Sequence, residues 1–462
     1  MKNSNRIIIL NILSTVIIQG LNFFTMPIFS RVLGVDNYGI VSIYATWVLI
    51  MTAVFSLEAG SSLNMGRIRF SLEEQPQYQS SILSLGTFSY VCFSILVVIF
   101  SKQLAALMKL DHRILMAMLV HSYGQFCVGL LNGKFTYEFK AARNFILSVV
   151  TSVSSIGLSL ILIYQLPASQ NYWGRILGQS ITYGLLSVAV WLVIFPKGKT
   201  LFSKEYWKFC LPLTLPVIFH MLANHILGQT DRIMLQHMID DAEVGIYSLA
   251  SSFSVALCIV WTALNNSWTP FYMEYSKQNR IPEMLKRAKN YLELFTVLAS
   301  GFILLTPEVY HVFADSDFWG GTNLIPILAI GYYMVFLYSF AVNYEFFHQQ
   351  TRLIATNTAI AAVLNIVLNY FFIRLWGGFG AALATATAHT MQFIIHYLMA
   401  KFAIKNDEFP FKLRTLLPYT AVFMVVAIGC IVLPIAWYIR WGVGAVIGVW
   451  ELYRIYKRKQ IF

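Results

Sequence analysis

Long apolar segments alternate with short polar ones along almost the whole chain. A window of about 19 residues finds roughly fourteen segments that could cross about 30 Å of hydrocarbon as helices rising 1.5 Å per residue. The predicted spans cover approximately residues 7–30, 40–63, 81–101, 114–133, 144–165, 175–195, 209–230, 245–268, 290–312, 324–346, 355–373, 380–400, 415–433 and 436–452. The pattern predicts an all-α polytopic membrane protein with about 14 transmembrane helices.

The composition supports this prediction. Of the 462 residues, 58% are hydrophobic and 12% are charged, and the mean hydropathy is +0.64. An ordinary soluble domain carries about a quarter charged residues. The first apolar segment has no small-residue cleavage site, so we expect it to remain as a helix. The five cysteines occur singly, without a CxxC pair or a histidine at ligand spacing, so neither a disulfide framework nor a zinc site is predicted.

Basic residues gather on one side of the predicted topology. The net charge is +12, and 25 of the 33 lysines and arginines fall in segments that share a side with the N-terminus. The positive-inside rule therefore predicts that both termini are cytoplasmic. Because topology explains the basic surplus, we expect no nucleic-acid partner. All connections are short, which disfavours a membrane glycosyltransferase or polymerase with its catalytic acids on a folded loop.

Two halves of the chain resemble each other at a constant offset. Residues 39–45 (GIVSIYA) resemble residues 245–251 (GIYSLAS), 206 positions later, and residues 172–174 lie opposite 378–380 at the same offset. Chance matches between glycine-containing apolar strings are the alternative explanation. A duplication predicts an N-terminal lobe at 1–206, a C-terminal lobe at 207–410 and a C-terminal helix pair with a basic tail at 411–462. Two pseudo-symmetric six-helix lobes around a central cavity would favour transport by alternating access.

Polar residues inside the predicted spans indicate which helix faces border such a cavity, because a polar group in hydrocarbon needs a partner or water. His220, Asn224 and Asp231 follow one helical stripe of the seventh span. The predicted substrate-cavity residues are Asn11, Thr15, Asn22, Arg31, His220, Asn224, Arg232, Asn265, Asn266, His389, Gln392 and His396. The predicted ion-coupling or gating residues are Asp231, Glu58 and Glu345.

Each of these residues also has a purely structural explanation. Asn and His in membrane helices often hydrogen-bond neighbouring helices for about 1 kcal/mol. Asp231 and Arg232 could form an ion pair at a helix end, and Arg31 could be an interfacial anchor. Glu58 could be neutralised by the nearby Arg67 and Arg69.

No catalytic motif stands out in the sequence. It contains no nucleophile elbow, no GxxxxGK phosphate loop, no HExxH pair and no acidic ladder for a metal. We therefore expect a protein that is not an enzyme and needs no cofactor or metal. Without a nucleotide-binding motif, transport would depend on an ion gradient, the membrane potential or consumption of the product.

Several strings resemble a known family. They are residues 31–39 (RVLGVDNYG), 231–235 (DRIML), 242–247 (AEVGIY), 365–369 (NIVLN) and 377–385 (GGFGAALAT). These strings are similar to those of bacterial polysaccharide-biosynthesis flippases of the multidrug/oligosaccharidyl-lipid/polysaccharide exporter superfamily, and the resemblance extends from the first to the twelfth span.

The resemblance implies a bacterial inner-membrane flippase for undecaprenyl-pyrophosphate-linked oligosaccharides. Such a protein turns repeat units from the inner to the outer leaflet for O-antigen and lipopolysaccharide, capsule or exopolysaccharide assembly. Its partners would be the lipid-linked substrate, the bilayer, and a polysaccharide polymerase with chain-length proteins. Cavity arginines would hold the pyrophosphate in this family, whereas Arg31 and Arg232 here lie at the outer ends of their spans.

Two other functions remain open from the sequence. A cation-coupled multidrug or small-molecule exporter of the same superfamily would share the two lobes, although the scarcity of acidic residues in the spans disfavours it. An integral-membrane glycosyltransferase or polymerase is the second alternative. The sugar composition, the coupling ion and the oligomeric state leave no recognisable signal.

Overall fold

The chain folds into helices throughout its described length. The computed structural model describes the backbone of residues 2–404 and 408–458 and the side chains of residues 23–404 and 408–458. These residues form fourteen α-helices and no strand. The helices are α1 (Lys2–Phe55), α2 (Leu63–Arg69), α3 (Gln75–Ile99), α4 (Ser101–Met108), α5 (His112–Tyr137), α6 (Ala141–Ile163), α7 (Asn171–Gly198), α8 (Lys204–Met238), α9 (Asp241–Lys277), α10 (Ile281–Phe313), α11 (Leu324–Phe347), α12 (Thr351–Phe402), α13 (Leu413–Val432) and α14 (Trp437–Arg458). The predicted all-α class is confirmed.

Helices α1 and α12 each consist of two helical segments joined at a sharp bend. Helix α1 contains Gly34 with φ 72° and ψ 175°, and α12 contains Gly377 with φ 55° and ψ −134°. Glycine adopts a positive φ without the Cβ clash that other residues suffer. Each glycine therefore lets the chain turn sharply between two predicted spans without a separate loop.

Eleven helical segments of the described chain are long and apolar enough to cross a membrane. One of them, α12, has 52 residues and can supply two crossings, because one crossing needs about 20 residues. Helix α14 forms where the last span is predicted but is not among the eleven, because Arg440, Glu451 and Arg454 interrupt its apolar sequence. The protein is a multi-pass membrane protein.

Helix ends recur at the offset found in the sequence. Helix α3 begins at Gln75, and α10 begins at Ile281, which is the position equivalent to Gln75 under that offset. Helix α7 begins at Asn171, and the bend in α12 lies at the equivalent position, Gly377. Matching helix ends at one offset support a duplicated six-helix arrangement.

The contacts divide the chain into two compact units, residues 1–245 and 246–462. Unit 1 holds α1 to α8 and the first turn of α9, and unit 2 holds the rest of α9 and α10 to α14. The lobe boundaries after residues 206 and 410 follow the sequence repeat and stay a prediction.

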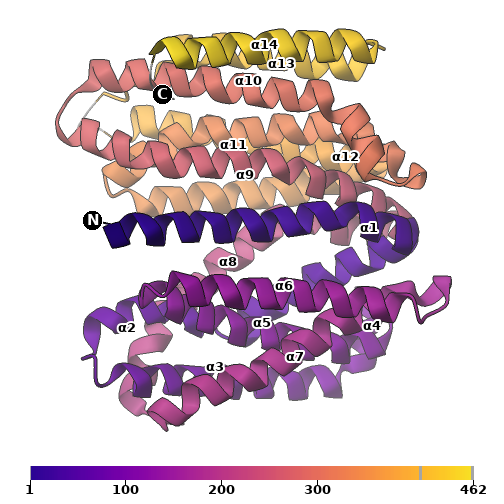
Figure 1. Ribbon diagram of the computed structural model, residues 1–462, viewed down its shortest axis with the longest axis vertical. Helices are drawn as coiled ribbons and strands as arrows, with labels where there is room; N and C mark the ends of the chain where they lie inside the picture. The colour runs from indigo at the N-terminus through magenta and orange to yellow at the C-terminus, as the bar shows by residue number, and fades with distance from the viewer. Residues whose placement is uncertain (1, 405–407, 459–462) are drawn as a thin grey trace. The chain divides into compact units, whose positions relative to one another are not determined.

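Unit 1 is held together mainly by the packing of α5 against α7, and of α6 against α7, which run side by side in Figure 1. The buried side chains of α3 and α5, including Ile82, Leu83 and Cys127, form one apolar cluster. The opposite face of α3 exposes Phe88, Val91 and Ile95 at helical spacing. An exposed apolar face of this kind is what a lipid-facing helix requires.

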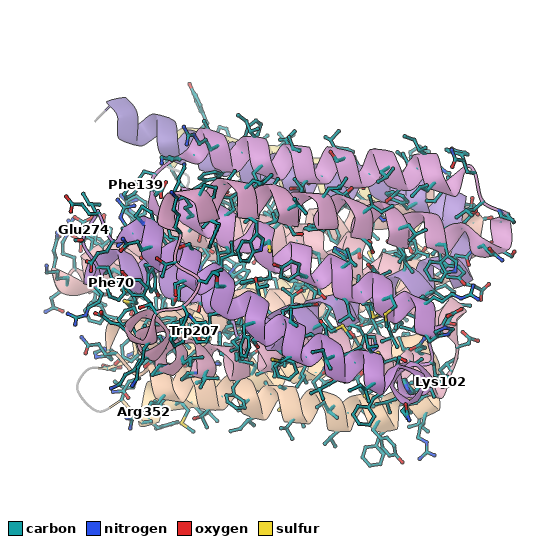
Figure 2. The ribbon with its side chains drawn as sticks, turned by 90° about the horizontal axis from the view of Figure 1, so that it is seen from below. Phe70, Lys102, Phe139, Trp207, Glu274 and Arg352 are labelled. Atoms are coloured by element: carbon teal, nitrogen blue, oxygen red, sulfur yellow. The ribbon has the colours of Figure 1, made fainter. Side chains whose placement is uncertain are left out.

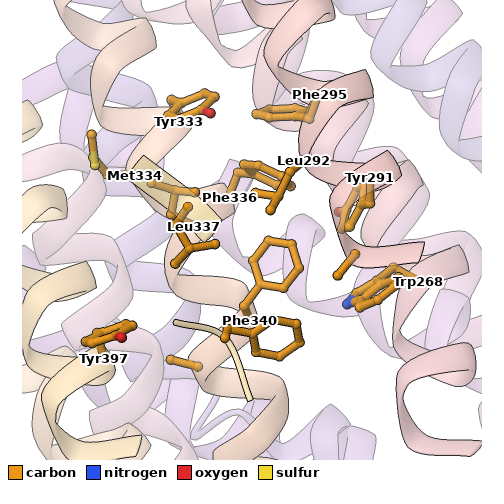
Figure 3. Packing of buried hydrophobic residues seen from close by; sticks show 14 of the residues in the cluster. Trp268, Tyr291, Leu292, Phe295, Tyr333, Met334, Phe336, Leu337, Phe340 and Tyr397 are labelled. Atoms are coloured by element: carbon orange, nitrogen blue, oxygen red, sulfur yellow. The ribbon is translucent and has the colours of Figure 1, made fainter. Parts of the chain in front are cut away.

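Unit 2 has an aromatic core. Trp268, Tyr291, Phe336 and Phe340 converge from α9, α10 and α11 in Figure 3, and Tyr291 and Phe336 meet edge to face with ring centroids 5.1 Å apart. Aromatic pairs in this geometry contribute about 0.5–1.5 kcal/mol beyond area burial. The cluster therefore fixes the relative rotation of the three helices.

The C-terminal helix pair packs onto α10 within unit 2, as Figure 1 shows. Phe423 of α13 stacks on Tyr333 of α11 with ring centroids 4.1 Å apart. Helix α14 is tied to α10 by ion pairs from Arg440 to Glu308 and from Arg454 and Arg458 to Glu293.

Candidate functional site

The predicted stripe of α8 lies on an accessible face of unit 1. His220 and Asn224 are both exposed and hydrogen-bond each other at 3.1 Å. Gly228, one turn further along the helix, has open space where a Cβ would stand. The structure thus brings His220 and Asn224 together on a face that solvent or a polar ligand can reach.

The end of this stripe is part of a hydrogen-bonded network with α1. Asp231 is 4% exposed, and its Oδ1 accepts a hydrogen bond from the backbone N–H of Arg232 at 2.8 Å. The guanidinium of Arg232 donates to the side-chain carbonyl of Gln229. Thr46 of α1 donates to the same oxygen at 3.3 Å. Sequence reasoning identified Asp231 and Arg232 but missed Gln229 and Thr46, which link α8 to α1.

The remaining predicted residues of unit 1 are more scattered. Arg31 is exposed on α1, ahead of the Gly34 bend. Glu58 is half-buried in the turn between α1 and α2, where its φ of 47° places it in the left-handed region. The side chains of Asn11, Thr15 and Asn22 lie outside the described residues.

In unit 2, two predicted residues form a buried pair. His396 of α12 and Glu345 of α11 are both 0% exposed, and His396 Nδ1 lies 2.8 Å from Glu345 Oε2. Asn357 of α12 reaches the same imidazole nitrogen at 3.4 Å, and the ring of Tyr338 stacks on His396. The structure therefore places Glu345 and His396 inside the helix packing rather than on an accessible surface.

Two other predicted residues of α12, His389 and Gln392, contact each other. The His389 ring nitrogen Nδ1 lies 3.2 Å from Gln392 Oε1, and Gln392 is buried while His389 is half-buried. These two residues hydrogen-bond along one helix, and the ring of His389 also lies near that of Tyr332 on α11, with ring centroids 6.5 Å apart.

On α9, the two neighbouring predicted residues differ in exposure. Asn266 is exposed, whereas Asn265 is half-buried. Thr269 donates to the backbone carbonyl of Asn265 at 2.9 Å and approaches the side-chain oxygen of Asn343 on α11 at 3.4 Å. Asn265 thus lies beside a polar contact between α9 and α11.

Sequence reasoning missed a cation, Arg175, that packs between three helices of unit 1. The guanidinium of Arg175 on α7 lies 4.0 Å from the ring centroid of Phe29 on α1 and 3.3 Å from Ser159 Oγ on α6. A cation over an aromatic face is stabilised by about 0.5–2 kcal/mol. In the sequence, Arg175 was counted only as a basic residue on the outer side of the membrane. Its aromatic partner, Phe29, lies far away in the chain, so no local pattern joins the two.

A buried polar network also involves α7, the helix of Arg175. The hydroxyl of Tyr44 on α1 lies 2.9 Å from His121 Nδ1 on α5 and 2.9 Å from Ser180 Oγ on α7, and all three residues are buried. Such a network joins three helices of unit 1 by hydrogen bonds. No periodic stripe signals it, because each helix contributes a single residue.

The described residues hold no cluster of three or more histidine, cysteine or acidic side chains that could bind a metal ion. The residues described above offer hydrogen bonding and cation–anion attraction, which suits the recognition of polar or anionic groups.

Comparisons with known proteins agree with this architecture. The chain is 21% identical over 402 residues to the probable low-salt glycan biosynthesis flippase Agl15 of Haloferax volcanii, covering 84% of this chain and 81% of that protein. Its fold matches the lipid II flippase MurJ in an inward closed conformation with a TM-score of 0.73 at 17% identity, over 97% of this chain and 99% of MurJ.

A multidrug resistance MATE family transporter of the MOP superfamily in an inward-facing conformation has the same fold, with a TM-score of 0.64 at 15% identity over 87% of this chain and 95% of the transporter. Residues 5–276, more than half of the chain, match one family throughout. The chain therefore belongs to the family described as polysaccharide biosynthesis protein, and it has the fold of the MurJ and MATE transporters.

Proposed function

We propose that this protein is a flippase that turns lipid-linked oligosaccharide repeat units from the inner to the outer leaflet of the bacterial cytoplasmic membrane by alternating access. The observation that carries the proposal is membership of the polysaccharide biosynthesis family over residues 5–276. The similarity to a glycan biosynthesis flippase and the fold shared with a lipid II flippase support it.

The polar residues of α8 are suited to carrying a polar headgroup through the membrane. A pyrophosphate-linked sugar cannot cross hydrocarbon unaided, because its charged and hydroxyl groups would lose their hydration. The exposed pair His220 and Asn224 offers donors and acceptors that could replace water around such a headgroup. Undecaprenyl pyrophosphate is the carrier we propose, and surface polysaccharide such as O-antigen, capsule or exopolysaccharide is the product.

The decisive test follows the substrate across the membrane. Purified protein is placed in liposomes with undecaprenyl-pyrophosphate-linked oligosaccharide, and the fraction of glycan that an impermeant glycosidase can cleave is followed with time. The proposal predicts that the protein makes the glycan of the inner leaflet accessible. In cells, deletion should accumulate the lipid-linked oligosaccharide on the inner leaflet. Unchanged surface glycan in the deletion strain would contradict the proposal.

A cation-coupled exporter of small molecules is the second candidate. Its supporting observations are the MATE fold match and the buried carboxyl of Glu345 beside His396, since a membrane carboxyl is a common ion-coupling group. This candidate predicts that the deletion strain becomes more sensitive to cationic dyes with normal surface glycan. The two functions thus give opposite results in one strain.

A further inference from the structure

A basic pocket lies at one end of unit 1, formed by α2, α3, α5 and the turn after α5. Its volume is about 290 Å³. The polar and charged side chains that line it are Arg67, Gln75, Gln79, Lys134, Glu138 and Lys140. We call this the α2–α3–α5 pocket. In the sequence, the lysines and arginine of this pocket entered only the count of basic residues on each side of the membrane.

The cations of the pocket outnumber its acids. Lys134 and Lys140 both bond the carboxylate of Glu138, at 2.6 Å and 2.5 Å, and Lys134 also bonds the side-chain oxygen of Gln79. Burial raises the pKa of Glu138, but hydrogen bonds and charges from the two lysines outweigh burial and lower it to about 2. With one carboxylate against three cations, the pocket keeps two positive charges in excess.

Arg67 is the cation of the pocket whose guanidinium can donate hydrogen bonds to a ligand. Its guanidinium lies 5.4 Å from the ring centroid of Phe139, and no carboxylate of the described residues lies within ion-pair distance of it. A guanidinium presents five N–H donors in a planar fork that matches two oxygens of a phosphate. Lys134 is held in place at 8% exposure, so it can supply a second, fixed charge.

The repeat provides an internal comparison. Unit 2 has a pocket of about 350 Å³ at the equivalent helix ends. Lys134, Tyr137 and Glu138 line the first pocket, and Tyr344, Phe347 and His348 line the second with the same spacing between them.

These three positions differ by 210 residues between the pockets, and two further lining positions differ by the repeat offset of 206. Ile281 and Leu285 of the second pocket stand at the repeat positions of Gln75 and Gln79 in the first. Tyr344 and Leu285 of the second pocket stand where the first pocket has Lys134 and Gln79, and the charged residues of the second pocket, Lys412 and Glu408, form an ion pair at 3.0 Å. The second pocket thus has one lysine balanced by one glutamate, so an excess of cations is not required to form a pocket at these helix ends.

The rim of the pocket is apolar and accessible. Ile68, Leu72 and Phe139 are 79%, 82% and 67% exposed. Figure 2 shows Phe70 and Phe139 at one end of unit 1 and Lys102 at the other. The basic-residue count predicts that the end with Phe139 is cytoplasmic. Apolar side chains around a basic pocket at a helix end are typical of the boundary between lipid headgroups and acyl chains.

We propose that the α2–α3–α5 pocket binds the phosphate group of a membrane lipid at the inner leaflet, with Arg67 and Lys140 contacting the phosphate oxygens and Lys134 supplying the buried charge. Resting on the proposed function, the ligand of this pocket is the diphosphate of the lipid-linked oligosaccharide before it is flipped. The anionic headgroup of a bulk phospholipid shares the same chemistry, so the experiment separates the two sources.

The test measures binding of radiolabelled undecaprenyl pyrophosphate to the full-length protein in nanodiscs of neutral phosphatidylcholine. Arg67→Ala and Lys140→Ala should each weaken binding about 10-fold, because each removes a charge-assisted hydrogen bond. Arg67→Lys should recover part of the loss. Arg69→Ala is the matched control, because Arg69 is an exposed cation on the same helix outside the pocket, and it should bind within about 2-fold of the wild type.

The variant Glu138→Gln distinguishes a ligand-binding role of the pocket charges from a purely structural one. Glutamine keeps an oxygen that can accept from Lys134 but removes the only carboxylate lining the described pocket. Binding of the pyrophosphate lipid should therefore tighten in this variant even if the protein melts at a lower temperature. Unchanged binding in Arg67→Ala, Lys140→Ala and Glu138→Gln would overturn the proposal.

Competition identifies the source of the phosphate. Displacement of the label by unlabelled undecaprenyl pyrophosphate but not by excess phosphatidylglycerol supports the transport substrate, and equal displacement by both supports a bulk-lipid headgroup. Failure of the wild type to flip glycan, with Arg67-dependent binding intact, would refute the proposed function alone. Flipping by the wild type with binding unaffected by the pocket variants would refute this inference alone.

Discussion

Two equivalent glycines mark a very close backbone contact in unit 1, and replacing one of them should destabilise the protein. A Cβ on Gly39 would lie 1.9 Å from the carbonyl oxygen of Asp241, and a Cβ on Gly245 would lie 2.2 Å from the carbonyl oxygen of Val35. Gly39 and Gly245 occupy equivalent positions of the repeat, as do Val35 and Asp241, so the contact is reciprocal. Small residues let membrane helices approach this closely.

The magnitude follows from the size of the clash. An ordinary contact needs 3.4–4 Å, and the Asp241 carbonyl belongs to the first turn of α9, so it cannot simply rotate away. Overpacking of this kind costs about 1–3 kcal/mol. Alanine in a helix recovers about 0.5–1 kcal/mol relative to glycine. We expect Gly39→Ala to lower the free energy of unfolding by about 1–2 kcal/mol in balance.

The assay is thermal unfolding of the purified protein in detergent, followed by the fraction that stays monodisperse after heating. Gly157→Ala is the matched control, because Gly157 on α6 has open space where its Cβ would stand. The control should be slightly more stable than the wild type, whereas Gly39→Ala and Gly245→Ala should both lose stability. If Gly39→Ala melts with the control, the close approach does not exist and the reasoning is wrong.

Four further results follow from individual contacts. Asp231→Ala should fail to restore surface glycan in a deletion strain at wild-type membrane levels, and full complementation would exclude a role for the α8 network. Arg175→Met should lower stability by about 1–2 kcal/mol by losing its cation–π contact, and an unchanged melting temperature would contradict this. His396→Leu should lower the free energy of unfolding by about 1–3 kcal/mol, because Glu345 loses its buried partner. Adding Glu345→Leu should recover most of this loss, and no recovery would argue against a coupled pair. Because the pKa of Glu138 is lowered to about 2, its ion pairs should stabilise the protein fully above about pH 4.5 and lose this effect as the pH falls toward 2. The stability difference from Glu138→Gln should therefore be smaller at about pH 3 than at about pH 6, and equal differences at these two values would refute the lowered pKa.

The α8 stripe shows what periodicity can and cannot predict. His220 and Asn224 stand one turn apart, and one turn brings side chains together on any helix, so their contact followed from the spacing alone. The hydrogen bond between Gln229 and Thr46 did not follow from the spacing, because Thr46 lies on another helix. Sequence spacing describes one helix at a time.

The histidines of α12 make the same point. His389 and His396 stand at helical spacing and look equivalent in the sequence. In the structure His389 bonds Gln392 on its own helix, whereas His396 pairs with Glu345, 51 residues away. The rotation of α12 against α11 decides which of them is fully buried, and that rotation is set by packing.

The amino-acid sequence by itself determined the helical class and the approximate spans, because hydrocarbon accepts a backbone only when about 20 apolar residues satisfy their own hydrogen bonds. Only the tertiary structure decided that Arg175 lies over Phe29, that Gly39 meets Asp241, and that Lys134 turns into a pocket instead of toward solvent. Those contacts join helices far apart in the chain. Their geometry depends on how side chains of several helices fill space together, which no single segment encodes.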